Sequence, residues 1–208
     1  MSEKEFYTYE PHQGHGLLHD PFNSIIAPRP IGWISTISAE GVPNLAPYSF
    51  FNAFNYNPPI IGFSSIGVKD TLKNSRETKE FVWNLVTRPL ADQMNLSSTE
   101  FDRNIDEFEA VMLQKLPSLF IRPLRVAASP VQFECRVTQI VQLRSFDEQP
   151  IETWLTLGEV VAIHIEKKLV KDGVYHTAAA GPVQRGGGKG FYSEITESSM
   201  FNMRRPEK

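Results

Sequence analysis

Residues 58–71 read Pro-Pro-Ile-Ile-Gly-Phe-Ser-Ser-Ile-Gly-Val-Lys-Asp-Thr. The proline pair leads into a short apolar strand that ends in two serines, and a turn with a glycine follows. Lys69, Asp70 and Thr71 then open a helix predicted over 71–79, because that segment lacks Gly and Pro. Hydroxyls, free backbone N–H groups and one ammonium therefore meet at a helix N-terminus, where the helix dipole favours an anion. The stretch predicts a phosphate-binding site.

The same residue types also occur at ordinary junctions between a strand and a helix, because Ser and Asp are common helix caps. Asp70 in particular would repel a phosphate. We expect the Asp70 side chain to cap the helix backbone, while Ser64, Ser65, Lys69 and Thr71 face the anion.

The rest of the chain has mainly β-strand patterns. Strands are predicted over 31–38, within 42–54, and over 60–64, 80–87, 131–143 and 154–165, with a hairpin over 167–175 that turns at Asp172-Gly173. Further helices are predicted from Pro89 to about Ser97 and around 105–111, whereas 1–28 is loop-rich and 185–192 is too glycine-rich for regular structure. Six or so strands with irregularly inserted helices favour a mainly β barrel over a doubly wound parallel sheet.

Composition limits the class of protein. A chain of 208 residues, 41% hydrophobic and 22% charged, suits one domain whose core needs no disulfide or metal. We predict an N-terminal extension over 1–24 and one domain over 25–208. The formal charge of −3 indicates no nucleic-acid partner. A single cysteine, Cys135, and the absence of an apolar leader or membrane-length run predict a cytoplasmic protein with no membrane contact.

Three short motifs resemble known catalytic or metal sites but do not match them. After Gly62-Phe63-Ser64, the second glycine of a nucleophile elbow arrives one residue late, at Gly67. Gly188-Lys189-Gly190 lacks the remaining residues of a phosphate-binding P-loop. The histidines at 12, 15 and 19 are separated by glycines that disfavour a helix. We therefore predict no metal site and name no catalytic acid or base.

The phosphate-site residues belong to an ordered series of motifs. The series comprises Arg29-Pro30, Ser35-Thr36, Asn44-x-Ala46-Pro47-Tyr48-Ser49-x-Phe51, Pro58-Pro59, Ser64-Ser65, Lys69-Asp70-Thr71, Asn74-x-Arg76-Glu77-Thr78, Glu80-Phe81-Val82-x-Asn84-Leu85-Val86, Gly158-Glu159-Val160-Val161 and Arg185-x-Gly187. In order and spacing it resembles the flavin reductase-like family, the FMN-binding split-barrel proteins that include flavoredoxins and the small reductase components of two-component monooxygenases. The resemblance begins near residue 25. The tail departs from the family pattern, because three glycines follow Arg185.

The resemblance implies a six-stranded FMN-binding split β-barrel and a homodimer with one FMN per subunit near its interface. It also implies that the strand from Ala46 to Phe51 lies along the isoalloxazine ring, that the phosphate is held by Ser64, Ser65, Lys69 and Thr71, and that Asn84 lies near the ring or ribityl chain. The residues predicted to bind the cofactor are Trp33, Ser35, Thr36, Ala46, Pro47, Tyr48, Ser49, Phe51, Ser64, Ser65, Lys69, Asp70, Thr71, Asn84 and Arg185.

Three functions are compatible with this resemblance. The first is an NAD(P)H-dependent flavin reductase, which passes hydride from nicotinamide to FMN. The second is an FMN-bound electron carrier that does not use NAD(P)H directly, and the third is a non-redox protein that binds FMN or another phosphorylated ligand. A flavin carries the redox chemistry itself, so a catalytic dyad is not needed. The reductase would act on a small molecule and could serve a monooxygenase or another electron acceptor, while the choice between NADH and NADPH stays open.

Overall fold

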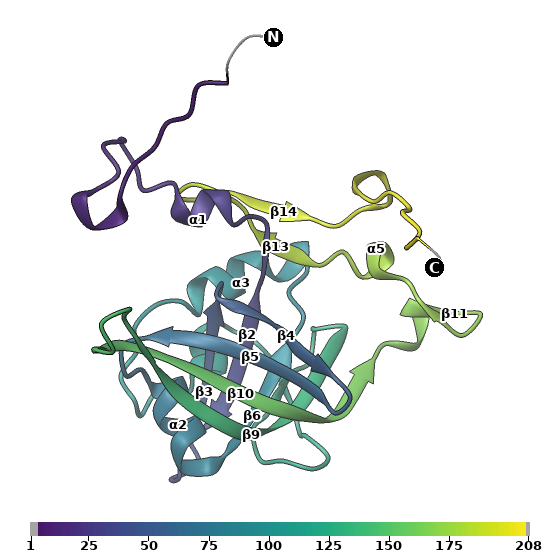
Figure 1. Cartoon of the computed structure of the whole chain (residues 1–208). Coiled ribbons are helices and arrows are strands. Elements are labelled where there is room, and N and C mark those ends of the chain that lie inside the picture. The colour runs from purple at the N-terminus through teal and green to yellow at the C-terminus, as the bar shows by residue number, and fades with distance from the viewer. Residues whose placement is uncertain (1–3, 207–208) are drawn as a thin grey trace.

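The computed structural model describes residues 4–206, in which β-structure predominates (Figure 1). The strands are β1 (Arg29–Pro30), β2 (Gly32–Ile37), β3 (Pro43–Tyr48), β4 (Phe51–Tyr56), β5 (Pro59–Ile66), β6 (Glu80–Asn84), β7 (Lys115–Leu116), β8 (Arg125–Val126), β9 (Val131–Arg144), β10 (Pro150–Ile165), β11 (Val170–Lys171), β12 (Val174–Tyr175), β13 (Val183–Arg185) and β14 (Tyr192–Glu194). The α-helices are α1 (Phe22–Ile25), α2 (Asp70–Thr78), α3 (Ala91–Leu96), α4 (Glu107–Ala110) and α5 (Thr177–Ala180). Short 3₁₀ helices are η1 (Pro11–Gln13), η2 (Arg88–Leu90), η3 (Lys167–Leu169) and η4 (Glu197–Ser199). Over this part of the chain, no helix has the length and apolar character needed to cross a membrane.

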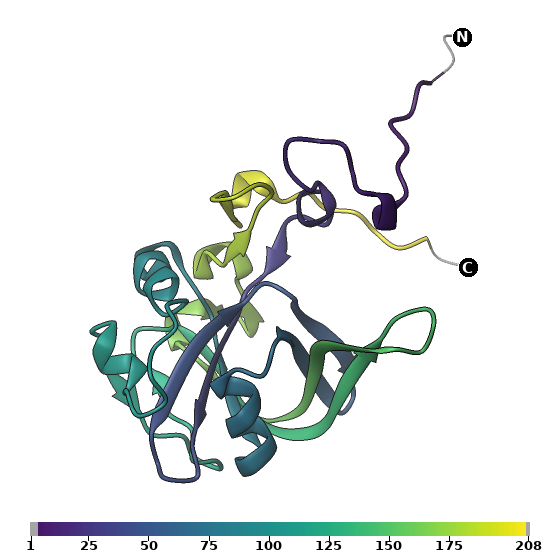
Figure 2. The same cartoon turned by 90° about the vertical axis from the view of Figure 1, so that its left-hand side faces the viewer.

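Seven strands form one sheet in the order β3-β2-β6-β9-β10-β5-β4, with antiparallel neighbours throughout. The long pair β9 and β10 shifts register between residues 157 and 158 and again between 160 and 162 of β10. Such irregularities increase local twist and bend. Figures 1 and 2 show the sheet curled into a barrel, with α2 at its side and the β13–β14 hairpin outside it. The predicted mainly β barrel is confirmed.

Within the seven-stranded sheet, the strand count differs from the prediction at one place. The single strand predicted within 42–54 is two strands, β3 and β4, which turn into each other at Ser49 and Phe50. Arg29 stabilises this turn: its Nε donates to the carbonyl oxygen of Ser49 at 3.2 Å, and its guanidinium lies 5.8 Å from the centre of the Phe50 ring. The sheet therefore has seven strands instead of six, and β3 and β4 form its two edges.

Aromatic side chains fill the barrel interior. The Phe63 ring lies 4.8 Å from that of Tyr48 and 5.5 Å from that of Phe81, centre to centre. Gly158 on β10 leaves room for Phe81, because a Cβ at position 158 would lie 2.4 Å from Cε1 of that ring. A second core cluster surrounds the buried Trp33 and includes residues from α3 and α4, so these helices pack against β2 and β3. This packing places the start of α4 and the chain after α3 beside β3.

Helix α2 begins one residue earlier than predicted. Asp70 is its first residue, Lys69 is the N-cap residue, and Lys79 adopts the left-handed conformation (φ 60°) at the C-terminal end. The prediction that Asp70 caps the helix is therefore wrong. Its carboxylate forms ion pairs instead, because Lys73 and Arg103 lie within reach.

The segment around the glycine-rich loop contacts residues near the start of the domain. β13 pairs with β1 on one side and with β14 on the other. Between β13 and β14 the loop winds around Arg185, whose guanidinium donates to the carbonyl oxygens of Gly188, Lys189 and Phe191 at 2.8–3.2 Å. The N–H of Gly188 donates to Oγ of Ser24 at 2.9 Å, which connects this loop to the N-terminal segment.

Candidate functional site: an anion-binding cavity at a helix N-terminus

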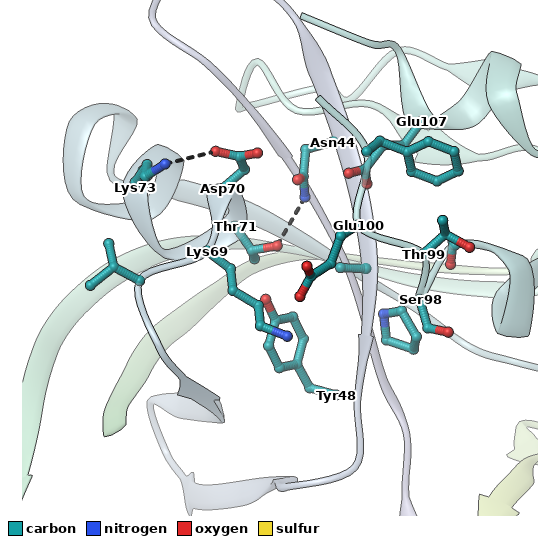
Figure 3. A pocket seen from close by; sticks show the side chains of 15 residues that line it. Asn44, Tyr48, Lys69, Asp70, Thr71, Lys73, Ser98, Thr99, Glu100 and Glu107 are labelled. Carbon is teal, nitrogen blue, oxygen red and sulfur yellow. Dashed lines mark hydrogen bonds and ion pairs between the residues drawn. The ribbon is translucent and has the colours of Figure 1, made fainter. Parts of the chain in front are cut away.

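A cavity of about 380 Å³ lies at the N-terminus of α2, between this helix, β3 and the segment after α3 (Figure 3). That volume falls within the range of small-molecule sites. The lining residues are Asn44, Ala46, Pro47, Tyr48, Val68, Lys69, Asp70, Thr71, Lys73, Ser97, Ser98, Thr99, Glu100, Phe101 and Glu107. Six of the predicted cofactor-binding residues come together here: Ala46, Pro47, Tyr48, Lys69, Asp70 and Thr71.

The N-terminus of α2 presents unsatisfied donors to this cavity. The first backbone N–H groups of a helix have no intrahelical acceptor, and no side chain among residues 4–206 caps this one. The exposed Lys69 side chain lines the same cavity and takes part in none of the ion pairs of this part of the chain. A helix dipole and an unpaired ammonium both favour an anion at this point.

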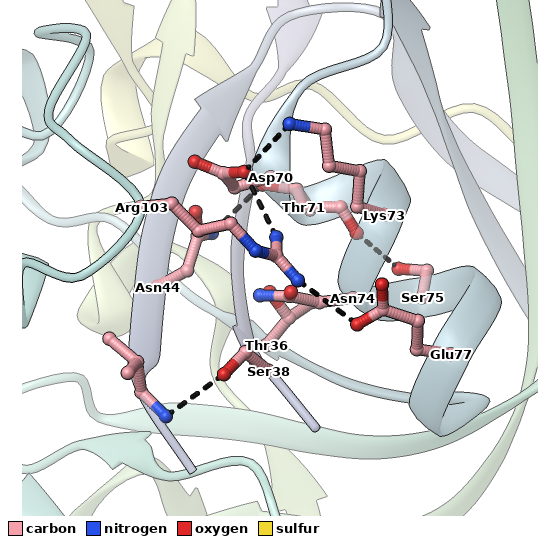
Figure 4. A network of polar contacts seen from close by, with 11 residues as sticks. Thr36, Ser38, Asn44, Asp70, Thr71, Lys73, Asn74, Ser75, Glu77 and Arg103 are labelled. Atoms are coloured by element: carbon pink, nitrogen blue, oxygen red, sulfur yellow. Dashed lines mark hydrogen bonds and ion pairs between the residues drawn. The ribbon is translucent and has the colours of Figure 1, made fainter. Parts of the chain in front are cut away.

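The negative charge of Asp70 is neutralised locally. Its Oδ1 lies 3.3 Å from Nζ of Lys73 and 3.0 Å from Nη1 of Arg103, and the other arm of Arg103 binds Glu77 at 3.0 Å (Figure 4). The sequence alone suggested that Asp70 would repel a phosphate. Arg103, which is 33 residues away in the chain, reduces that repulsion by pairing with the carboxylate.

The Thr71 side chain is held by β3, and its backbone carbonyl is held within α2. Nδ2 of Asn44 on β3 donates to Oγ1 of Thr71 at 2.9 Å, so the hydroxyl proton of Thr71 is available to another acceptor (Figure 4). Ser75 donates to the carbonyl oxygen of Thr71 at 2.7 Å. These contacts fix the start of α2 against the edge strand, so the donor positions are set by the fold.

The Tyr48 hydroxyl is the least satisfied polar group of the site. It is buried and has no hydrogen-bond partner among the residues that the structure describes, although the hydroxyls of Thr71 and Ser65 lie nearby. Burial raises the pKa of Tyr48 to about 12, so the hydroxyl keeps its proton at neutral pH. Leaving a buried donor unpaired costs free energy, about 1–3 kcal/mol in typical cases. A ligand acceptor in the cavity would relieve that cost.

Glu107 adds a buried carboxyl group from α4. Its Oε2 accepts the N–H of Leu45 at 2.6 Å. The pKa of Glu107 is raised to about 7, mainly because the group is buried and also because the negative charges of Asp70 and Asp106 are near. The carboxyl group therefore changes its charge near neutral pH inside the cavity.

A second cavity of about 170 Å³ adjoins the first, since both are lined by Pro47, Tyr48 and Ser98. It also includes Ser49 and Arg185 from the prediction, together with Ile31, Met94, Asn95 and Tyr192. The Arg185 guanidinium lies 4.8 Å from the centre of the Tyr192 ring. Arg185 thus stands at the border between this cavity and the glycine-rich loop.

The remaining predicted residues lie outside the lining of both cavities. Trp33 is buried and donates through Nε1 to Ser97, which itself lines the larger cavity. Ser35 donates to the carbonyl oxygen of Leu124, and Thr36 accepts from Asn74. Trp33 and Ser35 therefore contact the chain on one side of β2, and Thr36 contacts α2 on the other side.

Of the other four predicted residues, Asn84, Phe51 and Ser65 contact protein groups through their side chains, and Ser64 does so through its backbone. Asn84 is buried, donates to the carbonyl oxygen of Trp33 and accepts from the N–H of Val126. Phe51 stacks on Trp83 with ring centres 5.6 Å apart. Ser65 donates to the carbonyl oxygen of Gly67 and so closes the turn before α2, and the N–H of the preceding Ser64 donates to the carbonyl oxygen of Phe50.

Sequence reasoning missed the side of the cavity formed by the chain after α3. This side includes Ser98, Thr99, Glu100, Phe101 and Glu107. Nothing in their local pattern indicates a site, because their position depends on the packing of α3 and α4 against β3. Asn44 did carry a signal, since it stands in the Asn44-x-Ala46-Pro47 motif. Over residues 4–206, no group of three or more His, Cys, Asp or Glu side chains could hold a metal ion.

The structure is a split antiparallel barrel with an uncapped helix terminus at a cavity whose lining also includes the apolar residues Ala46, Pro47, Val68 and Phe101. The sequence model of a protein family, the flavin reductase like domain, matches residues 25–183 of this chain. The chain therefore belongs to the flavin reductase-like family. This confirms the resemblance found in the sequence.

The chain is also similar to individual proteins. An uncharacterized protein of Aquifex aeolicus is 34% identical over 182 residues, which is 85% of this chain and 89% of the relative. The structure of nitrilotriacetate monooxygenase component B from Bacillus cereus is similar with a TM-score of 0.85 at 27% identity, covering 97% of this chain and 100% of that one. The structure of 2-nitrobenzoate 2-nitroreductase from Pseudomonas fluorescens has a TM-score of 0.76 at 30% identity, with coverages of 89% and 88%.

Proposed function

We propose that this protein binds FMN in the cavity at the N-terminus of α2 and acts as an NAD(P)H-dependent flavin reductase. One observation carries the proposal. The uncapped α2 N-terminus, the unpaired Lys69 ammonium and the unpartnered Tyr48 hydroxyl meet in a cavity whose lining also includes apolar side chains. The donors match a phosphate monoester, and the apolar lining residues can contact a flat ring system. Membership of the flavin reductase-like family supports the same ligand.

In this proposal the cavity residues divide into two groups. Lys69, Thr71 and the first N–H groups of α2 bind the phosphate, and the apolar side chains of Ala46, Pro47 and Phe101 contact the ring system. FMN is preferred over FAD, because an adenylate would have to pass Lys69 and the helix. Other predicted residues support the site through their side-chain contacts with protein groups: Trp33, Ser35, Thr36, Ser65 and Asn84.

Bound FMN would supply the hydride and electron transfer chemistry. The contribution of this chain is to hold the ligand and to leave room for a second reactant, which raises the rate by proximity and orientation. The adjoining cavity with Ser49, Arg185 and Tyr192 is the proposed place for that reactant. No side chain is assigned to proton transfer in this scheme.

The relatives suggest two kinds of electron acceptor. One similar structure is component B of a monooxygenase, so reduced flavin could serve a separate oxygenase. Another is a nitroreductase, so a small aromatic molecule is a second acceptor to test. An FMN-bound electron carrier and a non-redox FMN-binding protein are the alternatives, and both would use the same cavity.

The protein is further proposed to be a cytoplasmic homodimer formed by the domain over 25–208. Large apolar side chains are exposed on the edge strand β4 and on both terminal segments: Phe6, Leu18, Phe22, Ile25, Phe54, Tyr56, Phe191 and Phe201. Such exposure is typical of an association surface. Light scattering should give about twice the chain mass of 23.6 kDa. The single buried thiol of Cys135 is compatible with a reducing compartment.

Anaerobic mixing of the FMN-loaded protein with NADH and, separately, with NADPH tests the reductase. We expect at least one of the two nucleotides, NADH or NADPH, to bleach the flavin absorption within the time of a turnover. A protein that binds FMN but is bleached by neither would be a carrier or a non-redox binder. A protein that binds no flavin at all would contradict the proposal at its first step.

A further inference from the structure

Glu107 is the buried acidic residue of the cavity lining, and binding of a phosphate does not explain its carboxyl group. It is buried, lines the cavity, and takes part in none of the ion pairs within residues 4–206. Its single recorded hydrogen bond comes from the N–H of Leu45. A buried carboxylate without a cation is costly, and such groups tend to hold a proton instead.

Neighbouring carboxylates do not share this situation. Asp106, the preceding residue, accepts two backbone N–H groups at the start of α4 and pairs with Lys115 at 2.5 Å. Asp70 pairs with two cations. Glu107 therefore differs from both in having a single neutral partner.

The charges facing Glu107 make the arrangement unfavourable for a second anion. Figure 3 shows Asp70, Glu100 and Glu107 around the same cavity as Lys69 and Lys73. Lys73 is already paired with Asp70, which leaves Lys69 as the unpaired cation of the lining. The titratable and charged groups on the elements around Glu107 are Tyr48 of β3, Lys69, Asp70 and Lys73 at the start of α2, Glu100 and Arg103 after α3, and Asp106, Glu109 and Lys115 around α4.

We propose that Glu107 is a ligand-binding residue that takes up a proton from solvent when FMN binds. With the phosphate in the cavity, the Glu107 side chain is then a neutral carboxyl group and not a carboxylate. This inference rests on the proposed function. The raised pKa of Glu107, about 7 in the free protein, supports it, because a dianion entering the cavity would raise that pKa further. One proton moves from the buffer to a Glu107 oxygen, and no bond of the ligand is made or broken.

Calorimetric titration with FMN at pH 8, in buffers of different ionisation enthalpy, tests the inference. A phosphate monoester has a second pKa of about 6, so the ligand is then a dianion. The wild-type protein should take up roughly half to one proton per FMN, and its affinity should fall up to about tenfold per pH unit above 7. The variant Glu107→Gln keeps the shape of the side chain and an oxygen for Leu45, but it should take up no proton and show a flat pH dependence.

The matched control is Glu109→Gln, which removes the same charge from the same helix outside the cavity. It should retain the wild-type proton uptake. Equal uptake in Glu107→Gln and wild type, or binding of FMN by the wild type without uptake, would overturn the role of Glu107 while the proposed function stands. Failure of the wild type to bind FMN at any pH would overturn both.

Discussion

Lys69 and Asp70 are adjacent in the chain, yet they have opposite roles in the structure. Asp70 is paired with Lys73 and Arg103, whereas Lys69 is exposed and lines the cavity at the uncapped end of α2. The local sequence predicted that Lys69 faces the phosphate and that Asp70 caps the helix. It could not show how the carboxylate is neutralised, because Arg103 comes from a distant loop.

Replacement of Lys69 by alanine should weaken FMN binding without unfolding the protein. A charge-assisted hydrogen bond to a phosphate contributes about 1.5–3 kcal/mol, so the loss should be roughly tenfold to a hundredfold. Flavin fluorescence titration measures the affinity, and thermal melting measures the stability. The control is Lys171→Ala, which changes an exposed lysine outside both cavities. An unchanged affinity in Lys69→Ala would remove Lys69 from the phosphate site.

Tyr48→Phe should act in opposite directions on stability and on binding. Without flavin the variant should be as stable as the wild type or more stable, by up to about 1 kcal/mol, because it removes a buried hydroxyl without a partner. With flavin it should bind about threefold to tenfold more weakly, if the hydroxyl donates to the ligand. Urea unfolding of the flavin-free protein and a flavin titration separate the two effects. A variant that is strongly destabilised and binds FMN normally would assign the hydroxyl to the fold alone.

Glu107 should make the stability of the flavin-free protein depend on pH. Its folded-state pKa of about 7 lies above the ordinary value of 4.5, so the native state binds more protons than the unfolded state between these values. The stabilising contribution is complete below pH 4.5 and is lost as the pH rises through 7. The melting temperature of Glu107→Gln relative to wild type should therefore increase between pH 5 and pH 8. A constant difference over this range would show that Glu107 does not titrate near neutral pH.

At the level of elements, the sequence periodicity predicted those strands and helices whose formation depends on local sequence pattern. The long strands β9 and β10, the helix α2 and the hairpin at Asp172-Gly173 all lie within a few residues of their predicted positions. The break between β3 and β4 could not be predicted in the same way. It depends on Arg29, which contacts Ser49 and Phe50 from about 20 residues upstream.

The same limit applies to the elements that form the cavity. The motif from Asn44 to Tyr48 and the helix start at Lys69 predicted one side of the site. The opposite side, with Phe101 and Glu107, arises from tertiary packing of α3 and α4 against β3, for which the sequence has no local signal.

The close packing of β10 against β6 gives a direct test at this scale. Gly158→Ala would place a Cβ 2.4 Å from the buried Phe81 ring and 3.3 Å from the carbonyl oxygen of Arg136. Overpacking of this kind typically costs about 1–3 kcal/mol, which urea unfolding can measure. Gly190→Ala is the matched control, because a Cβ there has no neighbour within 4 Å. A change below about 0.5 kcal/mol in Gly158→Ala would contradict the proposed fit of Phe81.

For the whole molecule, the barrel positions the cavity and the terminal segments complete its surroundings. Figure 1 shows α1, β13 and β14 together on one side of the barrel, and Arg185 from this layer lines the adjoining cavity. Residues that lie far apart in the chain thus border one continuous region, from the α2 terminus to the glycine-rich loop. The proposed homodimer would cover the exposed apolar side chains of the same terminal segments.

The central claim is that the phosphate of FMN binds at the N-terminus of α2. Titration of the wild-type protein with FMN and with riboflavin, followed by flavin fluorescence, tests it most directly, because the two ligands differ only in the phosphate. We expect FMN to bind at least about a hundredfold more tightly than riboflavin, since several charge-assisted hydrogen bonds are lost with the phosphate. Equal affinities for the two ligands, or no binding of FMN, would contradict the claim.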